Sequence, residues 1–475
     1  METSIFGLNI PAPCVRIKKE LWEDYANLYK GIRNQEDPVT WRTLVMTTKK
    51  LLATVDPEFK PIRKSKLPYA KKLLLQLTKK TFLEPLLPEL VYALGARNVK
   101  RRKNADLDFL LFNGRHSPEP LLWTLADFLK SKGKKVAVVN PVGHYNDGQT
   151  RVVGPSVFFR KVNKIIVLAS TQTKQGGSVS VLSNVIRLIR NPKLAEKVNE
   201  IEVIIPMFGG SRGHRLNQAD EVGFEVMEAA FNAKLLALPA KDLLFKLAKE
   251  TKRLPQVKFF SLDIHNDLYP AKVFGDEGFK FVSIDPAPEL AKAISCAIFS
   301  RRLARLPVRL VACDRGAVPR TASLAEKILG LTKLHLTNLE VVFLEKKRAT
   351  AGAVSSVKID RIEKWVKKKG KIKKIPLKIP KQANLAESVL IYSDDMIDTG
   401  GSAQKDINLL AEIFPDSALK IFVATHPVFS KGFSALKKIG ADIYILGNTL
   451  NCEGLAEIKG VRLVDLAPAI YRAII

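Results

Sequence analysis

The sequence predicts an α/β protein with two tandem domains, each built on a parallel sheet, preceded by a helical and basic N-terminal extension. From residue 106 onward, short apolar runs alternate with amphipathic stretches, a pattern typical of parallel strands covered by helices on both faces. The alternation occurs twice, which indicates one domain at 106–282 and a similar one at 283–475. Residues 1–105 lack it, and their apolar residues recur at helical spacing at 21–29, 41–53 and 69–95.

Each expected element follows from its local residues. Ser117-Pro118-Glu119 begins a helix that runs to Lys130, because Ser is a favoured N-cap and Pro is tolerated in the first turn. Apolar runs in the first domain predict strands at 107–112, 136–139, 164–168, 201–205 and 258–262, with a further helix at 180–190. The second domain has helices at 289–304 and 403–414, and strands at 308–312, 339–344, from Val389 onward and at 418–424.

Composition restricts the class of protein. The 475 residues are 46% hydrophobic, enough for sizeable cores. The four cysteines are scattered without a CxxC pair, which disfavours a disulfide framework or a zinc site and suits a reducing compartment. The first residues lack the layout of a signal peptide, and no apolar run is long enough to span a bilayer. We therefore expect a cytoplasmic protein.

The net charge of +30 has two interpretations. One is binding to nucleic acid or to an anionic membrane, and the other is a site for polyanionic substrates on a lysine-rich surface. The lysines recur throughout and are densest at 358–381, but no aromatic residues are interleaved with them in one tight motif. Polyanionic substrates are therefore favoured over a dedicated nucleic-acid interface.

The segment from Val389 to Ser402 is the most informative in the chain. An apolar run ends in Asp394 and Asp395, and Asp398-Thr399-Gly400-Gly401-Ser402 then leads into a helix. A strand, a turn of small residues and a helix N-terminus form a cradle for phosphate, since backbone N–H groups and the helix dipole face the anion. The two adjacent carboxylates could hold ribose hydroxyls or anchor a metal. A buried strand ending in a solvated acidic turn would explain the carboxylates alone, but not the full order of residues.

This segment resembles the phosphoribosyl-pyrophosphate binding motif of the type I phosphoribosyltransferase fold. The resemblance implies that Asp398, Thr399, Gly400, Gly401 and Ser402 bind the 5-phosphate of a ribose, and that Asp394 and Asp395 hold its hydroxyls. Two enzyme classes share this fold. One consumes the activated sugar to build nucleotides, and the other makes it.

A second segment separates the two classes. Glu345-Lys346-Lys347-Arg348 follows an expected strand and resembles the acidic-Lys-Arg-Arg segment of ribose-phosphate diphosphokinases, where it begins a mobile catalytic loop. The resemblance implies that Lys346 and Arg348 are catalytic cations, which stabilise charge during diphosphoryl transfer. In isolation a solvated basic turn would explain the residues, but ordinary phosphoribosyltransferases need no such pair.

Further partial matches to the same family occur in order from residue 106 to 475. Asp263-Ile264-His265 resembles a magnesium and ATP segment, Asp314 to Arg320 a pyrophosphate loop, and Thr425 to Ser430 a late strand end. The resemblance implies the metal ligands Asp263, His265 and Asp314. It implies the ATP-binding residues Tyr145, Asp147, Gln149, Arg212, His265 and Arg320.

Departures from the family pattern gather on the ATP side. Gly213-His214 stands where the family has Gln-Asp, Gln149 replaces a common Glu, and Ala317 replaces a loop glycine. These differences bear on the identity and affinity of the nucleotide donor. The ribose-phosphate motif is almost intact.

The resemblance as a whole implies a Mg²⁺-dependent kinase that transfers the diphosphoryl group of ATP to ribose 5-phosphate, giving phosphoribosyl pyrophosphate and AMP. Its expected partners are these two substrates and further copies of itself, with no membrane and no nucleic acid. Three alternatives stay open: a salvage phosphoribosyltransferase, a non-catalytic subunit that keeps the fold, and a nucleic-acid binding protein.

Overall fold

The computed structural model contains two large β-sheets within Asp106–Ile475. The expected helices of residues 1–105 lie outside the described residues, as does all but Ile186 of the helix expected at 180–190. The described ranges are 106–113, 119–139, 142–144, 150–152, 161–169, 186, 198–209, 228–250, 254–264, 268–331, 338–350, 353–380 and 387–475.

The first sheet is parallel throughout, with the strand order β2-β1-β5-β6-β7-β8. All five strands expected in this part of the chain are present. Their bounds, with the additional β8, are β1 Asp106–Asn113, β2 Val136–Val139, β5 Lys161–Leu168, β6 Val198–Ile205, β7 Gln256–Leu262 and β8 Lys280–Ile284. A separate small hairpin pairs β3 (Val142–His144) with β4 (Thr150–Val152).

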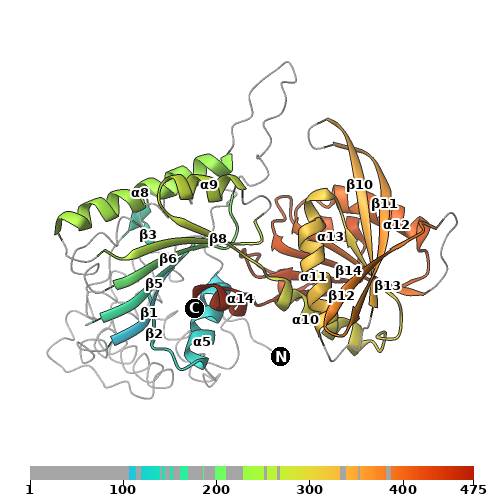
Figure 1. The fold of residues 1–475 in the computed structure, drawn as a ribbon, viewed down its shortest axis with the longest axis horizontal. Helices are drawn as coiled ribbons and strands as arrows, with labels where there is room; N and C mark the ends of the chain where they lie inside the picture. The colour runs from blue at the N-terminus through green and yellow to red at the C-terminus, as the bar shows by residue number, and fades with distance from the viewer. Residues whose placement is uncertain are drawn as a thin grey trace, which may run out of the picture. The chain divides into compact units, whose positions relative to one another are not determined.

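Helices cover both faces of this sheet, as the buried apolar strands require. Helices α8 (Glu228–Glu250) and α9 (Leu268–Asp276) lie on one face, and α5 (Glu119–Ser131) lies on the other (Figure 1). Alternate residues of β1 separate the two cores: Leu110 packs with the α8 side and Leu111 with the α5 side. Strand β8 runs across residue 283, where the sequence places the boundary between its two domains, and that boundary remains a prediction.

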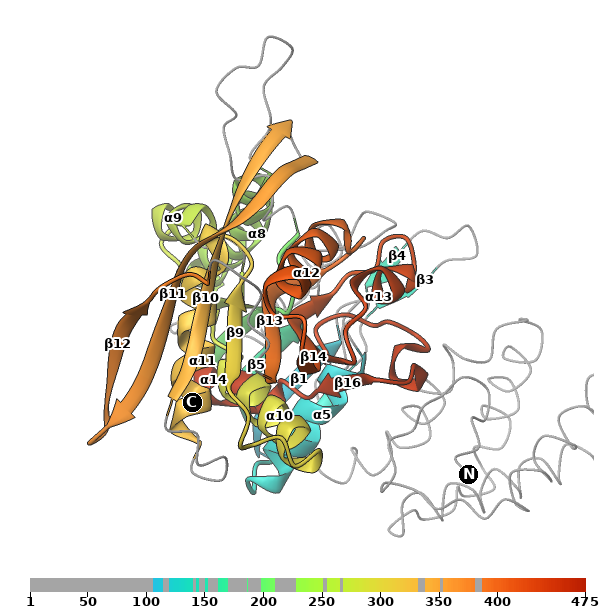
Figure 2. The same ribbon diagram turned by 90° about the vertical axis from the view of Figure 1, so that its right-hand side faces the viewer.

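The second sheet has the order β12-β11-β10-β9-β13-β14-β15-β16, with its lysine-rich strands β11 and β12 at one edge (Figure 2). The six strands from β10 to β16 in this order are mutually parallel, whereas β11 and β12 are antiparallel additions. The strand bounds are β9 Val308–Ala312, β10 Asn338–Thr350, β11 Ala353–Lys368, β12 Lys371–Leu377, β13 Ser388–Ile397, β14 Ser417–Pro427, β15 Ile443–Gly447 and β16 Val461–Val464. The helices are α10 Ala287–Ser300, α11 Val318–Gly330, α12 Gly401–Ile413, α13 Ser434–Ile439 and α14 Ala467–Ile474, with short 3₁₀ turns η2 Arg315–Ala317 and η4 Leu455–Glu457.

Two strands extend into residues that the sequence assigns to the functional site. β10 continues past Leu344 to Thr350, so that Glu345 to Arg348, expected to begin a loop, belong to a strand. The reason is the partner strand β11, which pairs with β10 along this stretch and places Val357 and Val354 opposite Lys346 and Arg348. β13 similarly includes Asp394 and Asp395, which we expected to follow the strand.

Among the described helices, none combines the length and the apolar character needed to cross a bilayer.

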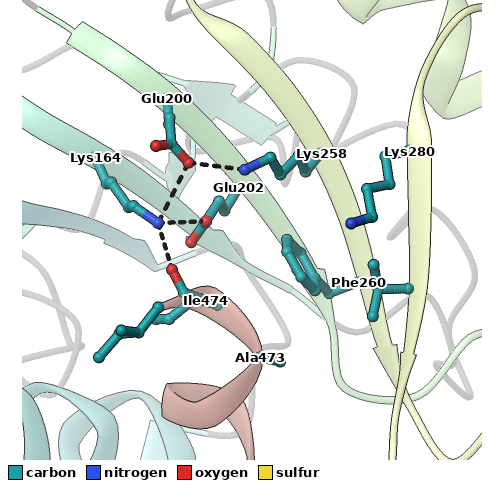
Figure 3. A pocket seen from close by; sticks show the side chains of 10 residues that line it. Lys164, Glu200, Glu202, Lys258, Phe260, Lys280, Ala473 and Ile474 are labelled. Carbon is teal, nitrogen blue, oxygen red and sulfur yellow. Dashed lines mark hydrogen bonds and ion pairs between the residues drawn. The ribbon is translucent and has the colours of Figure 1, made fainter.

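The C-terminal helix α14 is held against the first sheet by buried charges. The Lys164 ammonium on β5 donates to the Ile474 carbonyl and lies 3.2 Å from Glu200 and 3.0 Å from Glu202 (Figure 3). These groups line a cavity of about 300 Å³ that also contains Lys258 and Lys280. Glu202 is only 1% exposed, and its Oε2 atom has no hydrogen-bond partner in the described part of the chain. Its burial raises the pKa to about 7, although Lys164 opposes the shift.

We expect this carboxyl to make folding stability depend on pH. Because the folded state prefers neutral Glu202, its contribution is complete at low pH and is lost as the pH rises through about 7. By linkage the loss is roughly 3 kcal/mol at most. Urea unfolding of the wild type between about pH 5 and pH 8 should show the decline, and Glu202→Gln should flatten it. Glu200→Gln is the control. Burial raises the pKa of Glu200, but Lys258 and Lys164 outweigh burial and lower it overall, so Glu200 changes stability only at lower pH. An unchanged slope in Glu202→Gln would contradict this expectation.

Candidate functional site

The predicted ribose-phosphate motif forms a strand, a turn and a helix N-terminus. β13 ends at Ile397, the turn follows, and α12 begins at Gly401. Gly400 caps the helix with φ +74°, and a Cβ atom there would lie 3.1 Å from the Ala435 carbonyl oxygen. The Ser430 backbone N–H donates to Asp398 at 2.8 Å, which ties the turn to the segment after β14. The first N–H groups of a helix have no partner within the helix, so this helix N-terminus is a place where an anion can bind.

Thr399 and Ser402 lie on either side of Gly400 and are both exposed. Their hydroxyl groups flank the same helix N-terminus, so they can donate to the oxygens of a bound phosphate. The five residues predicted to bind the 5-phosphate are thus brought together by local structure alone.

Two carboxylates lie at the end of β13, beside this turn. The backbone N–H of Asp395 donates to Asp394 Oδ1 at 2.9 Å, and Asp395 is buried with 3% exposure. Burial, together with the neighbouring Asp395, raises the pKa of Asp394 well above its usual range. The two adjacent carboxylates are therefore stabilised by a bound proton, by a hydrogen bond from a sugar hydroxyl or by a cation, each of which reduces the repulsion between them.

Asp263 joins the two sheets at this site. It follows β7 of the first sheet with φ +40°, an uncommon backbone conformation for a residue with a side chain. Arg320 on α11 of the second sheet reaches both carboxylate oxygens with its Nε atom, at 2.7 and 2.8 Å. The Thr425 hydroxyl at the end of β14 donates to the same carboxylate at 2.5 Å. Asp263 and Arg320, both predicted to lie on the ATP side, thus contact each other, and Asp263 also contacts the end of β14, which is the neighbour of β13 in the sheet.

Thr425 and His426 are contact residues for which the sequence indicated no role. His426 is buried, with Nδ1 2.9 Å from the Thr449 hydroxyl and Nε2 3.4 Å from the Asp263 carbonyl oxygen. Burial lowers the pKa of His426, although nearby carboxylates oppose the shift, so the ring is neutral at physiological pH. The matching segment from Thr425 to Ser430 was visible in the sequence, but its contact with Asp263 depends on the packing of two distant strands.

Two of the three predicted metal ligands, Asp263 and Asp314, are among the described residues, and each already has partners in the protein. Asp314 caps the short turn η2 by accepting from the Ala317 backbone N–H at 3.0 Å, while both oxygens of Asp263 are occupied by Arg320 and Thr425. Within the described ranges, no cluster of three or more His, Cys, Asp or Glu side chains is arranged to hold a metal. His265 lies outside those ranges.

Lys346 reaches toward the ribose motif from β10. Its Nζ atom lies 2.8 Å from Asp406 Oδ2 on α12, and the two side chains are 6% and 0% exposed. Burial works against the ammonium, but Asp406 and Asp394 are among the groups that outweigh burial and raise the pKa of Lys346. The lysine is therefore a fixed cation in a strand, rather than part of a loop as the sequence predicted. Asp406 was not identified from the sequence.

Several predicted site residues cannot be placed. The side chain of Arg348 and the residues Tyr145, Asp147, Gln149, Arg212 and His265 lie outside the described residues. Their roles remain predictions.

Comparison with known proteins supports the fold. No protein-family model matches the chain, and no curated protein matches it by sequence. Among solved structures, the chain is similar to phosphoribosylpyrophosphate synthetase from Mycobacterium smegmatis, with a TM-score of 0.51 and 21% identity, over 77% of this chain and 97% of that one. Identity at this level bears on the fold alone. The chain therefore has a mixed α/β, two-domain phosphoribosyltransferase-like fold with parallel sheets.

Proposed function

We propose that this protein is a ribose-phosphate diphosphokinase, which transfers the β,γ-diphosphoryl group of ATP to the anomeric hydroxyl of ribose 5-phosphate. The observation that carries the proposal is the contact of Asp263 in the first sheet with Arg320 and Thr425 in the second. This contact brings the side of the molecule expected to bind ATP to the carboxylates of the ribose motif. A site that only consumed the activated sugar would not need this first-sheet contribution.

The ribose end of the site binds by charge and by hydrogen bonds. Backbone N–H groups at Gly400 and Gly401 and the hydroxyls of Thr399 and Ser402 hold the 5-phosphate at the helix N-terminus. Asp394 and Asp395 then accept hydrogen bonds from the ribose hydroxyls. The sugar is thereby held with its anomeric hydroxyl directed away from the phosphate turn, which orients it for in-line attack.

The reacting end needs positive charge more than covalent chemistry. Lys346 and Arg348 stabilise charge that develops on the transferred phosphate, while Arg320, Tyr145, Asp147, Gln149, Arg212 and His265 hold the nucleotide. Mg²⁺ binds through one or two carboxylates plus substrate phosphates and keeps several waters, so a set of three protein ligands is not required. Asp314 fits such a role, and when bound the ion neutralises charge on the phosphate oxygens. Asp263 fits it only after releasing Arg320.

We infer a cytoplasmic homo-oligomer that acts on two soluble, highly charged substrates. The net charge of +30 would then steer both polyanions toward the protein.

The proposal is tested by product analysis. Purified protein supplied with ATP, Mg²⁺ and ribose 5-phosphate should release AMP and phosphoribosyl pyrophosphate in equal amounts, measured by chromatography. ATP without the sugar is the control for simple hydrolysis. Release of pyrophosphate from phosphoribosyl pyrophosphate and a nucleobase, with no AMP in the first assay, would instead assign the protein to the salvage class. Inactivity in both assays would favour a non-catalytic subunit.

A further inference from the structure

A buried ion pair connects the phosphate turn to Lys346. Asp406 lies on the inward face of α12, the helix whose N-terminus forms the turn, and is 0% exposed. Its Oδ2 atom is 2.8 Å from Lys346 Nζ, and no hydroxyl or backbone N–H within the described residues donates to either carboxylate oxygen. The ammonium of Lys346 is therefore the principal compensation for this buried charge.

The row of side chains on β10 explains how Lys346 arrives there. Val342, Leu344 and Lys346 point to the same face of the strand, because successive side chains alternate. The first two belong to the core that also contains Ile407 and Leu410 of α12. Lys346 is the next residue in this row. It lies beyond the apolar core and is paired with Asp406 on α12, the helix that follows the ribose motif.

Stability alone does not account for the pair. A buried ion pair contributes little compared with well-packed apolar residues of the same size, because both charges lose their hydration. Its distinctive effect is to fix a charge in place. A lysine otherwise has a flexible four-carbon stem that can take many positions.

We propose that Asp406 is the positioning residue that holds the Lys346 ammonium beside the ribose-phosphate turn for diphosphoryl transfer. This inference rests on the proposed function. A cation fixed before the reaction stabilises developing phosphate charge without reorganising, which is the most effective form of electrostatic catalysis. Because Asp406 and the phosphate turn are on one helix, binding of the 5-phosphate and placement of Lys346 share a single rigid element.

The surroundings of Asp406 also predict how the reaction rate depends on pH. Burial raises the pKa of Asp406 to about 6, although Lys346 opposes the shift. The other groups near this pair are Cys313, which follows β9, Tyr392 on β13, and the carboxylates Asp314 and Asp394. Burial raises the pKa of both Cys313 and Tyr392, so these two stay neutral at physiological pH. The kcat of the wild type should therefore fall below about pH 6 as Asp406 loses its charge.

Asp406→Asn tests the proposal, with Asp406→Glu as the conservative variant. We expect Asn to lower kcat by about 10- to 100-fold, to leave the KM for ribose 5-phosphate nearly unchanged and to remove the acid limb near pH 6, whereas Glu recovers part of the rate. An acid limb that persists unchanged in Asp406→Asn would show that another titrating group sets it, and would overturn the proposal.

A second measurement does not depend on activity. Brief acetylation with acetic anhydride, followed by peptide mass spectrometry, reports the free amine of Lys346. Loss of the Asp406 charge lowers the pKa of the lysine, so labelling at a fixed pH should rise about tenfold for every pH unit by which that pKa falls. Glu340→Gln is the matched control, since it removes the charge of another ion-paired carboxylate on β10, which is half-buried and lies 2.7 Å from the buried Arg309.

The two measurements separate the two hypotheses. Unchanged labelling of Lys346 in Asp406→Asn would overturn the positioning role, whether or not the wild type makes AMP. Increased labelling in a protein that makes no AMP would overturn the proposed function, and the pair would then be only a structural anchor. Increased labelling together with a kcat equal to that of the wild type would also overturn the positioning role.

Discussion

Replacing Lys346 by Ala is expected to lower the rate of AMP formation by about a thousandfold. The ammonium is 6% exposed, lies 2.8 Å from Asp406 and stays charged, because its acidic neighbours outweigh burial. In the proposed reaction, removing it takes away a fixed positive charge at the point where phosphate charge develops. The KM values for both substrates should change much less, since the loss falls mainly on the transition state. Steady-state AMP release, measured over a range of both substrates, gives kcat and KM separately.

The control for this change is Lys358→Ala. Lys358 is exposed on β11 and pairs with Glu345, the neighbour of Lys346, at 2.9 Å. This variant tests whether the rate of AMP formation depends on Lys346 in particular or on any lysine of the β10–β11 hairpin. Because Lys346→Ala leaves a buried carboxylate without its partner, Lys346→Met should be measured as well, and urea unfolding should confirm that both variants fold. A folded Lys346→Met protein with nearly full activity would rule out a catalytic role.

Gly400→Ala is expected to have the second largest effect, on both ribose 5-phosphate binding and folding stability. The residue has φ +74°, and an added Cβ would lie 3.1 Å from the Ala435 carbonyl oxygen and 3.2 Å from Ile439 Cγ1. Strain and contact together should cost about 1–3 kcal/mol of stability. The turn relieves them by shifting its N–H groups, which should raise the KM for ribose 5-phosphate at least about tenfold. Urea unfolding and substrate titration measure the two effects.

Two other glycines separate the causes. Gly401→Ala adds a Cβ with nothing within 4 Å and without a positive φ, so it should not lower stability. Gly278→Ala, at φ +84° between α9 and β8, introduces backbone strain far along the chain from the ribose motif. It should lower stability while leaving the KM for ribose 5-phosphate unchanged. An unaltered KM in Gly400→Ala would show that the turn does not hold the phosphate.

Local sequence was sufficient for much of the fold. The strands predicted at 136–139 and 308–312 coincide with β2 and β9, because each is a short run rich in valine that pairs in a parallel sheet. β9 is buried throughout, whereas residues 136–138 of the edge strand β2 are half-buried. The turn between β13 and α12 could also be predicted, since a left-handed Gly400, two flanking hydroxyls and a helix N-terminus all lie within five consecutive residues. A feature whose interacting residues are close in sequence can therefore be predicted from the local sequence alone.

Other features depended on residues far away. β10 extends through Lys346 because β11 pairs with it, and the lysine-rich composition of that partner concealed the strand. The contact between Asp263 and Thr425 joins residues 162 positions apart. No local pattern records which acceptor a buried donor will meet.

The sequence by itself determined the parallel α/β class, the order of the strands along the chain and the strand–turn–helix form of the segment 389–402, because these follow from periodicity and short-range backbone geometry. Only the tertiary structure decided that Asp406 holds Lys346 and that Arg320 engages Asp263. The physical reason is that an ion's partner in a protein interior is set by which charges share a buried volume, and that volume exists only after the sheets have packed.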